Sequence, residues 1–352
     1  MGFYQAMQLS AANLKPLIKN AESKEIKNKY IAALILKSIL CLLFCTIVVI
    51  SFGKVFGEEN NVVGVVTVIS LLNFRFSNLD FKVRQAALTI VGIFGVLSIS
   101  PYIASISNPF LGFIINFISI IGILILTCHN VRLCNHSILV LSYFLLYGYK
   151  VENTEILINR IIGLIFGGIL VASIFYIKQR KIEFKNTFID IINDVDFNTE
   201  RTKWQLKFAF VTTSAIMIGE FLHIPRVMWI GIACMSVFHP DKSQLQIRYK
   251  QRMLYMVLGC LMYMSIYFLI PQQFRGLIGL IGGVMIGFSG TYKWQTVFNA
   301  FGALSAATPI LGFGGAIIFR ILNNVFGALY SKGFDYIINF IDNKEFANVN
   351  EA

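Results

Sequence analysis

Two arginines within apolar stretches are the residues of this sequence best suited to chemistry. Arg160 opens the pattern Arg-x-x-Gly-x-x-x-Gly, which continues through Gly163 to Gly167, and Arg320 stands at the same distance before Gly327. Positions four and seven residues apart share one helix face, and glycines on that face let two helices approach closely in a bilayer. Each arginine is therefore predicted to point into the protein, where a guanidinium would form charge-assisted hydrogen bonds with an anionic substrate.

Polar side chains and two short apolar stretches complete this candidate site. The stretches 61–74 and 227–239 are short for a bilayer with about 30 Å of hydrocarbon, and short segments at matching places in two repeats are a sign of a transporter site. The predicted substrate-binding or translocation residues are Arg160, Arg320, Asn159, Asn324, Asn61 and Trp229. Two alternatives stay open: the arginines extend toward water or pair with a helix end, and the short stretches only tilt less or thin the bilayer.

Incomplete copies of the pattern occur twice more. Arg252 precedes Gly259 at the same spacing, and Arg84 stands beside a copy that ends at Gly92. We predict that Arg84 and Arg252 form a cytoplasmic gate or contact lipid. The glycines predicted to lie at helix contacts are Gly64, Gly92, Gly163, Gly167, Gly231, Gly259 and Gly327.

The elements that must position these residues are membrane-spanning helices. The chain has 352 residues, of which 56% are apolar and only 14% are charged, whereas soluble domains carry about 25% charged residues. Because a spanning helix needs about 20 apolar residues, the sequence predicts an all-α polytopic membrane protein with 10 to 12 spans. The expected spans are 31–52, 61–74, 85–106, 110–128, 135–149, 156–177, 206–222, 227–239, 252–270, 275–290, 294–311 and 314–340.

Matching residues relate the two halves of the chain. Gly64 and Gly231 are separated by as many positions as Gly92 and Gly259, and a shorter offset relates the two arginines of the pattern. Two parallel repeats of six helices follow, as in many transporter folds. The expected division is a cytoplasmic segment 1–30, a first repeat 31–177, a linker 178–205, a second repeat 206–340 and a cytoplasmic tail 341–352.

The positive charges indicate an orientation in the membrane. Of the 30 Lys and Arg residues, only Lys54, Lys150, Arg226 and Arg275 fall in predicted outer loops. Cytoplasmic loops carry the excess of positive charge, so both termini and the linker are predicted to be cytoplasmic. The net charge of +12 then follows from this bias and from anionic lipids, and it gives no reason to expect nucleic acid as a partner.

Motifs for catalysis, cofactors and metals are lacking in the sequence. The six cysteines form no Cys-x-x-Cys pair, the four histidines fall at loop edges, and no phosphate-binding loop precedes a helix. The protein is therefore expected not to be an enzyme and to need no cofactor or metal. Glu220 and Asp335 lie near span ends, which weakens a proton-coupled mechanism and leaves a uniporter or channel open.

The spans, the basic loop after the second span and the arginine–glycine pattern resemble the fusaric acid resistance (FUSC) family. This family includes aromatic acid exporters, and its wider relatives include plant aluminium-activated malate transporters. The resemblance covers about 30–345 and implies export or permeation of small organic anions. It applies to Arg160, Gly163, Gly167, Arg252, Gly259, Arg320 and Gly327. The chain departs from the family pattern at Leu88, Tyr255 and Asn323, which replace the first glycine, and in having only a short linker.

The sequence thus predicts a transporter, in the exporting direction, of small aromatic carboxylate-like anions in the cell (plasma or inner) membrane. The alternatives are an anion channel or uniporter of the malate-transporter type and a non-transporting membrane assembly protein. The expected partners are the organic anion, membrane lipids and, as an open option, further copies of the chain. A major facilitator fold is disfavoured because the loop 73–84 lacks its Gly-x-x-x-Asp-Arg signature, and no span holds the polar triad of an intramembrane enzyme.

Overall fold

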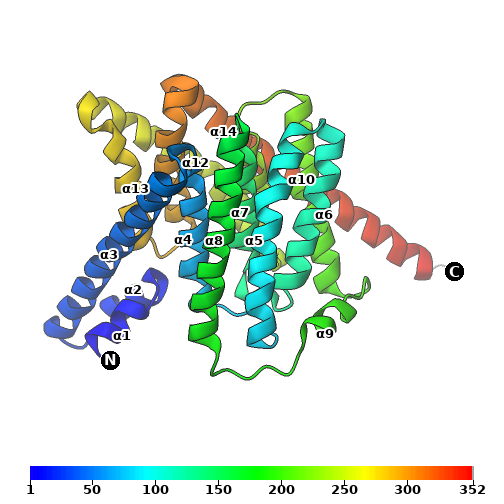
Figure 1. The fold of residues 1–352 in the computed structure, drawn as a ribbon, viewed down its shortest axis with the longest axis horizontal. Helices are drawn as coiled ribbons and strands as arrows, with labels where there is room; N and C mark the ends of the chain where they lie inside the picture. The colour runs from blue at the N-terminus through cyan, green and yellow to red at the C-terminus, as the bar shows by residue number, and fades with distance from the viewer. Residues whose placement is uncertain (351–352) are drawn as a thin grey trace. The chain divides into compact units, whose positions relative to one another are not determined.

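The computed structural model describes residues 1–350, with the side chains of all but Lys242 and the residues after 340 (Figure 1). Over these residues the chain is helical and has no strand. Every predicted span overlaps a helix. The long helices are α3 (Lys24–Phe56), α5 (Val83–Ile106), α6 (Pro109–Thr127), α8 (Thr154–Gln179), α10 (Glu200–Phe221), α12 (Lys242–Leu269) and α14 (Tyr292–Asn350). The shorter apolar ones are α4 (Asn61–Phe74), α7 (His136–Gly148), α11 (Met228–Val237) and α13 (Ile278–Phe288).

Six helices of the described chain are long and apolar enough to cross a membrane. They are α3, α5, α6 and α8, with Ser243–Leu269 of α12 and Tyr292–Phe340 of α14. The chain is therefore a multi-pass, all-helical membrane protein, as expected. The count of twelve spans and the arrangement in two repeats stay predictions.

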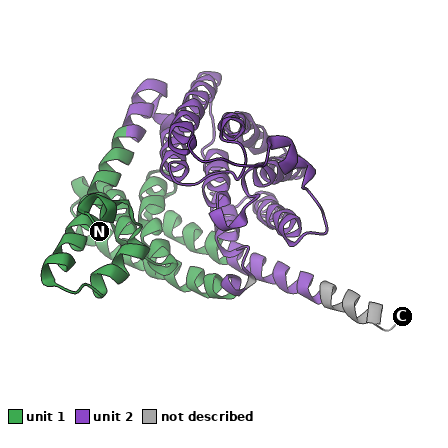
Figure 2. Ribbon diagram, turned by 90° about the horizontal axis from the view of Figure 1, so that it is seen from below, with its two compact units in different colours: residues 1–47, 246–325 green, residues 48–245, 326–352 purple. Residues whose placement is uncertain are grey.

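The chain divides into two compact units, which Figure 2 colours separately. Unit 1 consists of residues 1–47 and 246–325, and unit 2 consists of residues 48–245 and 326–352. Several helices therefore contribute residues to both units. The two predicted repeats are defined by sequence similarity, and their boundaries differ from those of the two compact units. The repeats therefore stay a prediction.

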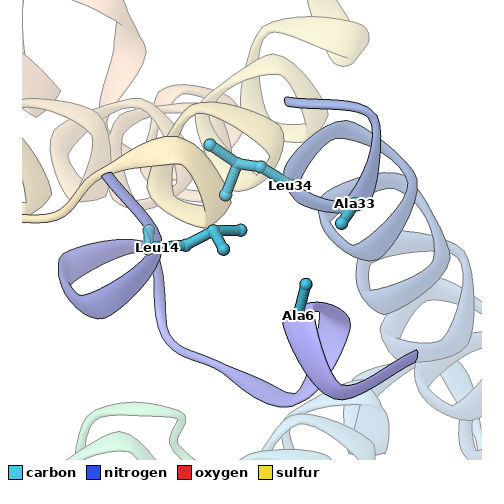
Figure 3. Packing of buried hydrophobic residues seen from close by; sticks show 5 residues of the cluster. Ala6, Leu14, Ala33 and Leu34 are labelled. Atoms are coloured by element: carbon cyan, nitrogen blue, oxygen red, sulfur yellow. The ribbon is translucent and has the colours of Figure 1, made fainter. Parts of the chain in front are cut away.

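The N-terminal segment of unit 1 folds onto the first long helix. Ser10 Oγ caps α2 (Ala11–Lys19) by accepting from the Asn13 N–H at 3.2 Å, which fixes the start of that helix. Ala6 of α1 (Phe3–Gln8) and Leu14 of α2 are buried together with Ala33 and Leu34 of α3 (Figure 3). The segment predicted as 1–30 thus contains two short amphipathic helices and the first turns of α3.

A single residue interrupts α14 within unit 1. Gly312 has φ 70° and ψ 165°, a backbone conformation that side chains disfavour. Pro309, three residues earlier, lacks the N–H that a continuous helix would use. The break falls between the predicted spans 294–311 and 314–340, so α14 consists of two helices joined without a loop.

Unit 2 places short helices among long ones. The helix α5 packs along α8, and α10 packs along α6, while α4 and α11 both contact α7. Nine of the fourteen residues of α4 are buried, and eight of the ten residues of α11 are buried. Because the surrounding helices cover them, the two short helices belong to the interior of this unit.

The linker between α8 and α10 is partly ordered by its own helix. α9 (Phe188–Asn193) begins with a capping box in which Thr187 and Asp190 bond each other's backbone N–H groups. The backbone carbonyl of Asn186 accepts from the Lys82 N–H at 2.9 Å, and Gln85 Oε1 accepts from the Phe188 N–H at 2.8 Å. These bonds fasten the linker to the first turn of α5.

Candidate functional site

Arg160 lies in the first part of α8 and is only 3% exposed. Asn153 starts this helix by accepting from the Ile156 N–H at 2.9 Å. The Arg160 Nε donates to Asn60 Oδ1 at 2.9 Å, one Nη donates to the carbonyl of Tyr149, and the other donates to the carbonyl of Glu59 at 3.4 Å. Tyr149 is the C-cap of α7, so the guanidinium stabilises a helix end.

The partner of Arg160 is Asn60, which the sequence reasoning missed. Asn60 is 1% exposed and donates to the carbonyls of Phe56 at 2.9 Å and Ile156 at 3.1 Å. The neighbouring Asn61 is exposed, and Asn159 is half-buried. The sequence offered one signal for this partner, the adjacent Asn60 and Asn61 at the start of a short span. Asn60 precedes α4, and Asn61 is its first residue.

The acceptors around Arg160 are all neutral oxygens of the protein. No carboxylate pairs with this guanidinium among the side chains that the structure describes. The Arg160 guanidinium nevertheless donates to two backbone carbonyls and one amide oxygen. This arrangement corresponds to the alternative in which the arginine pairs with a helix end. We therefore do not carry Arg160 into the proposed anion site.

A second polar cluster lies in unit 1 and is built on α12 and the second part of α14. Arg252, Arg320, Asn323 and Asn324 are each at most 4% exposed. The Nε and Nη2 atoms of Arg252 both donate to Asn324 Oδ1, at 3.0 and 2.7 Å. Asn324 Nδ2 in turn donates to the carbonyl of Arg320 at 2.6 Å, which orients the amide.

The two buried guanidinium groups of this cluster lie close enough for their charges to interact. Arg252 is paired with no carboxylate among the described side chains, and its hydrogen-bond acceptor there is the neutral amide of Asn324. Two neighbouring positive charges in a medium of low dielectric repel each other.

Both arginines of the cluster are far from the nearest helix end. Arg252 follows the first residue of α12 by ten positions, or about 15 Å at 1.5 Å per residue. Arg320 follows the break at Gly312 by eight positions, or about 12 Å. The helix α12 begins before the span predicted from 252, because polar residues continue the helix toward its N-terminus. Arg252 thus lies within the helix and is buried.

The glycines predicted at helix contacts lie at close approaches, with one exception. A Cβ at Gly64 would come within 2.8 Å of Val49 Cα, and one at Gly327 within 2.6 Å of the carbonyl of Ile230. Similar approaches occur at Gly163, Gly167, Gly231 and Gly259. Gly92 differs from the prediction, because nothing lies within 4 Å of an added Cβ and the residue is exposed.

The remaining candidates lie in unit 2. Trp229 is 2% exposed within α11, next to the close approach of Gly231 to Ile216. Arg84 is exposed at the start of α5 and lines an open cavity of about 520 Å³. The structure thus brings Arg252, Arg320 and Asn324 together, and it holds Arg160 in a separate arrangement.

Comparison with known families supports the reading of the sequence. Residues 214–331 match the model of the family described as fusaric acid resistance protein-like. The matched segment contains Arg252, Arg320 and Asn324, and it does not reach Arg160. No curated protein and no solved structure matches the chain significantly. The resemblance drawn from the sequence is thereby confirmed over residues 214–331, where the chain is similar to the fusaric acid resistance protein-like family.

Proposed function

We propose that the protein exports small organic anions of the aromatic carboxylate type across the cell membrane, with both termini in the cytoplasm. The family match and the apolar helices support membrane transport in general. The observation that carries the anionic substrate is the pair of buried arginines, Arg252 and Arg320, beside the amide of Asn324.

The cluster can replace the hydrogen bonds that an anion loses when it leaves water. A carboxylate entering a dry interior faces a large desolvation penalty, and a guanidinium compensates for it by bidentate, charge-assisted hydrogen bonds. The Arg252 guanidinium donates both of these hydrogen bonds to Asn324 Oδ1, which is an uncharged acceptor. A carboxylate is a stronger acceptor than an amide oxygen, so the substrate replaces Asn324 at the fork and leaves again without breaking an ion pair of the protein.

The export direction follows from the sign of the charge. The membrane potential of a cell is negative inside, and it moves one elementary charge with about 2.3 kcal/mol per 100 mV. An anion therefore moves outward without ATP, for which the sequence has no binding motif. Movement along the potential by a uniporter or channel is sufficient, and no coupling ion is part of the proposal.

Flux through purified protein in liposomes tests this function. We expect outward flux of a small aromatic carboxylate to fall at least ~10-fold in Arg252→Gln and in Arg320→Gln, since each removes one strong hydrogen-bonding charge worth about 1.5–3 kcal/mol. The arm with a neutral analogue of the substrate should show no such loss. Parental flux of the anion in both variants would overturn the assignment of the cluster. No flux in the parent would favour a membrane assembly protein.

A further inference from the structure

A basic cavity and an apolar groove adjoin each other in unit 2. The cavity, of about 520 Å³, is lined by Lys82 and Arg84 at the start of α5 and by Arg180 at the end of α8. The groove, of about 780 Å³, runs between α5 and α6 and is covered at one end by Phe188 and Ile189. Gln85 lines both, so the two spaces meet at this residue.

The cavity is positively charged. The side chains of Lys82, Arg84 and Arg180 are exposed, and none is in an ion pair among the described residues. Glu183 also lines the cavity, and Asp190 lies close enough to Lys82 for their charges to interact. Three positive side chains thus face two negative ones, and the balance at the cavity stays positive.

The groove is apolar and open to the side. Leu88 is 73% exposed, Ile118 is 62% exposed and Ile189 is 64% exposed, which in a membrane protein means contact with acyl chains. Gly92 and Gly122 have open space where a Cβ would be, and this deepens the groove. From Gln85 to Ser100 the groove follows α5 for about 22 Å, and one leaflet supplies about 15 Å of hydrocarbon.

We propose that this surface binds an anionic phospholipid, with its headgroup at Lys82, Arg84 and Arg180 and an acyl chain in the α5–α6 groove. Charge complementarity selects the headgroup, since basic pockets at the ends of spanning helices bind anionic headgroups. The groove selects an acyl chain over a water-soluble anion. The bonds from Asn186 and Gln85 to the neighbouring backbone hold the linker in place at the junction of the two spaces. The site is independent of the proposed transport function.

Lipid retention by the purified full-length protein tests the site. In native mass spectrometry, titration with phosphatidylglycerol should show saturable binding to the parent, and phosphatidylcholine should bind much more weakly. The triple variant Lys82→Gln/Arg84→Gln/Arg180→Gln should bind phosphatidylglycerol on the order of 100-fold more weakly, at about 1 kcal/mol per lost charge. Gly92→Leu, which fills the groove where no neighbour is displaced, should also weaken it.

A matched control carries the same loss of charge at exposed positions that line neither space: Arg132→Gln/Lys178→Gln/Lys181→Gln. This control should keep parental affinity within about twofold. Equal losses in the two triple variants would show attraction to the surface as a whole and overturn the site. Glycerol phosphate that competes as well as the lipid would also overturn it, because the groove would then contribute nothing. If one of the two variants, Gly92→Leu or the triple variant, fails to fold, the phosphatidylglycerol affinity of the other still tests the site.

Discussion

Arg252 directs two of its nitrogens at one oxygen, Oδ1 of Asn324, at 3.0 and 2.7 Å. The residues are 72 positions apart in sequence, and both are buried. One neutral oxygen occupies the fork of a guanidinium that is adapted to two carboxylate oxygens. In the proposed transporter, this contact is the place where the carboxylate of the substrate binds.

The first prediction replaces this amide by a carboxylate. Asn324→Asp keeps the shape of the side chain and gives Arg252 a permanent ion-pair partner in place of the substrate. The substitution also removes the donor to the Arg320 carbonyl, so the melting temperature is measured to identify folded protein. We expect flux of the aromatic carboxylate per folded molecule to fall at least ~10-fold, the equivalent of about 1.4 kcal/mol in binding. Asn159→Asp is the isosteric control outside the cluster. Undiminished flux in Asn324→Asp would contradict competition at the fork.

The second prediction concerns Arg160. Because its donors satisfy helix-end carbonyls and Asn60, Arg160→Gln should lower the unfolding free energy by about 1–3 kcal/mol, the range for buried groups left unsatisfied. Flux per folded molecule should stay within about twofold of the parent. Asn60→Ala should show the same pattern. A loss of flux in Arg160→Gln at unchanged stability would restore the anion role that the sequence suggests.

The third prediction compares glycines. Gly327→Ala brings a methyl group against the carbonyl of Ile230, where the separation would be 2.6 Å, so it should destabilise the protein by about 1–3 kcal/mol. Gly92→Ala meets open space and should melt within about 1 °C of the parent, or above it, since alanine favours a helix. Thermal unfolding in one detergent measures both. Equal melting temperatures would mean that Gly327 is not at a close helix contact.

The fourth prediction tests the proposed orientation. Single cysteines at Glu58 and at Lys185, in a background without native cysteines, should react oppositely with an impermeant thiol reagent added outside intact cells. The position at Glu58 should be labelled and the position at Lys185 should be protected until the membrane is opened. Labelling of both from outside would exclude the predicted arrangement.

The positions of the helices could be predicted because apolar length alone determines them. Where a helix continues into polar sequence, as at residues 242–251, hydropathy marks the start of the apolar span and not the start of the helix, so it gives no sign that Arg252 is buried within α12. The sequence predicts a break between the spans 294–311 and 314–340. It does not indicate that the break consists of the single residue Gly312.

The partners of the arginines could not be predicted, because they depend on which helices become neighbours. Arg160 and Arg320 begin similar patterns, and yet one stabilises the end of α7 while the other belongs to a two-arginine cluster. Spacing along one helix shows which residues share a face. It does not show whether that face meets a carbonyl, an amide or a second positive charge.

The joint at Gly312 has a mechanical consequence. Stiff helices leave it on both sides with no slack between them, so a change in its backbone angles turns one helix as a lever against the other. Arg320 lies about 12 Å along that lever, and a rotation of about 20° at the joint would displace it by about 4 Å. This displacement exceeds the length of a hydrogen bond. In the proposed transporter, two dihedral angles of this one glycine would thereby set whether Arg320 and Arg252 hold the same anion.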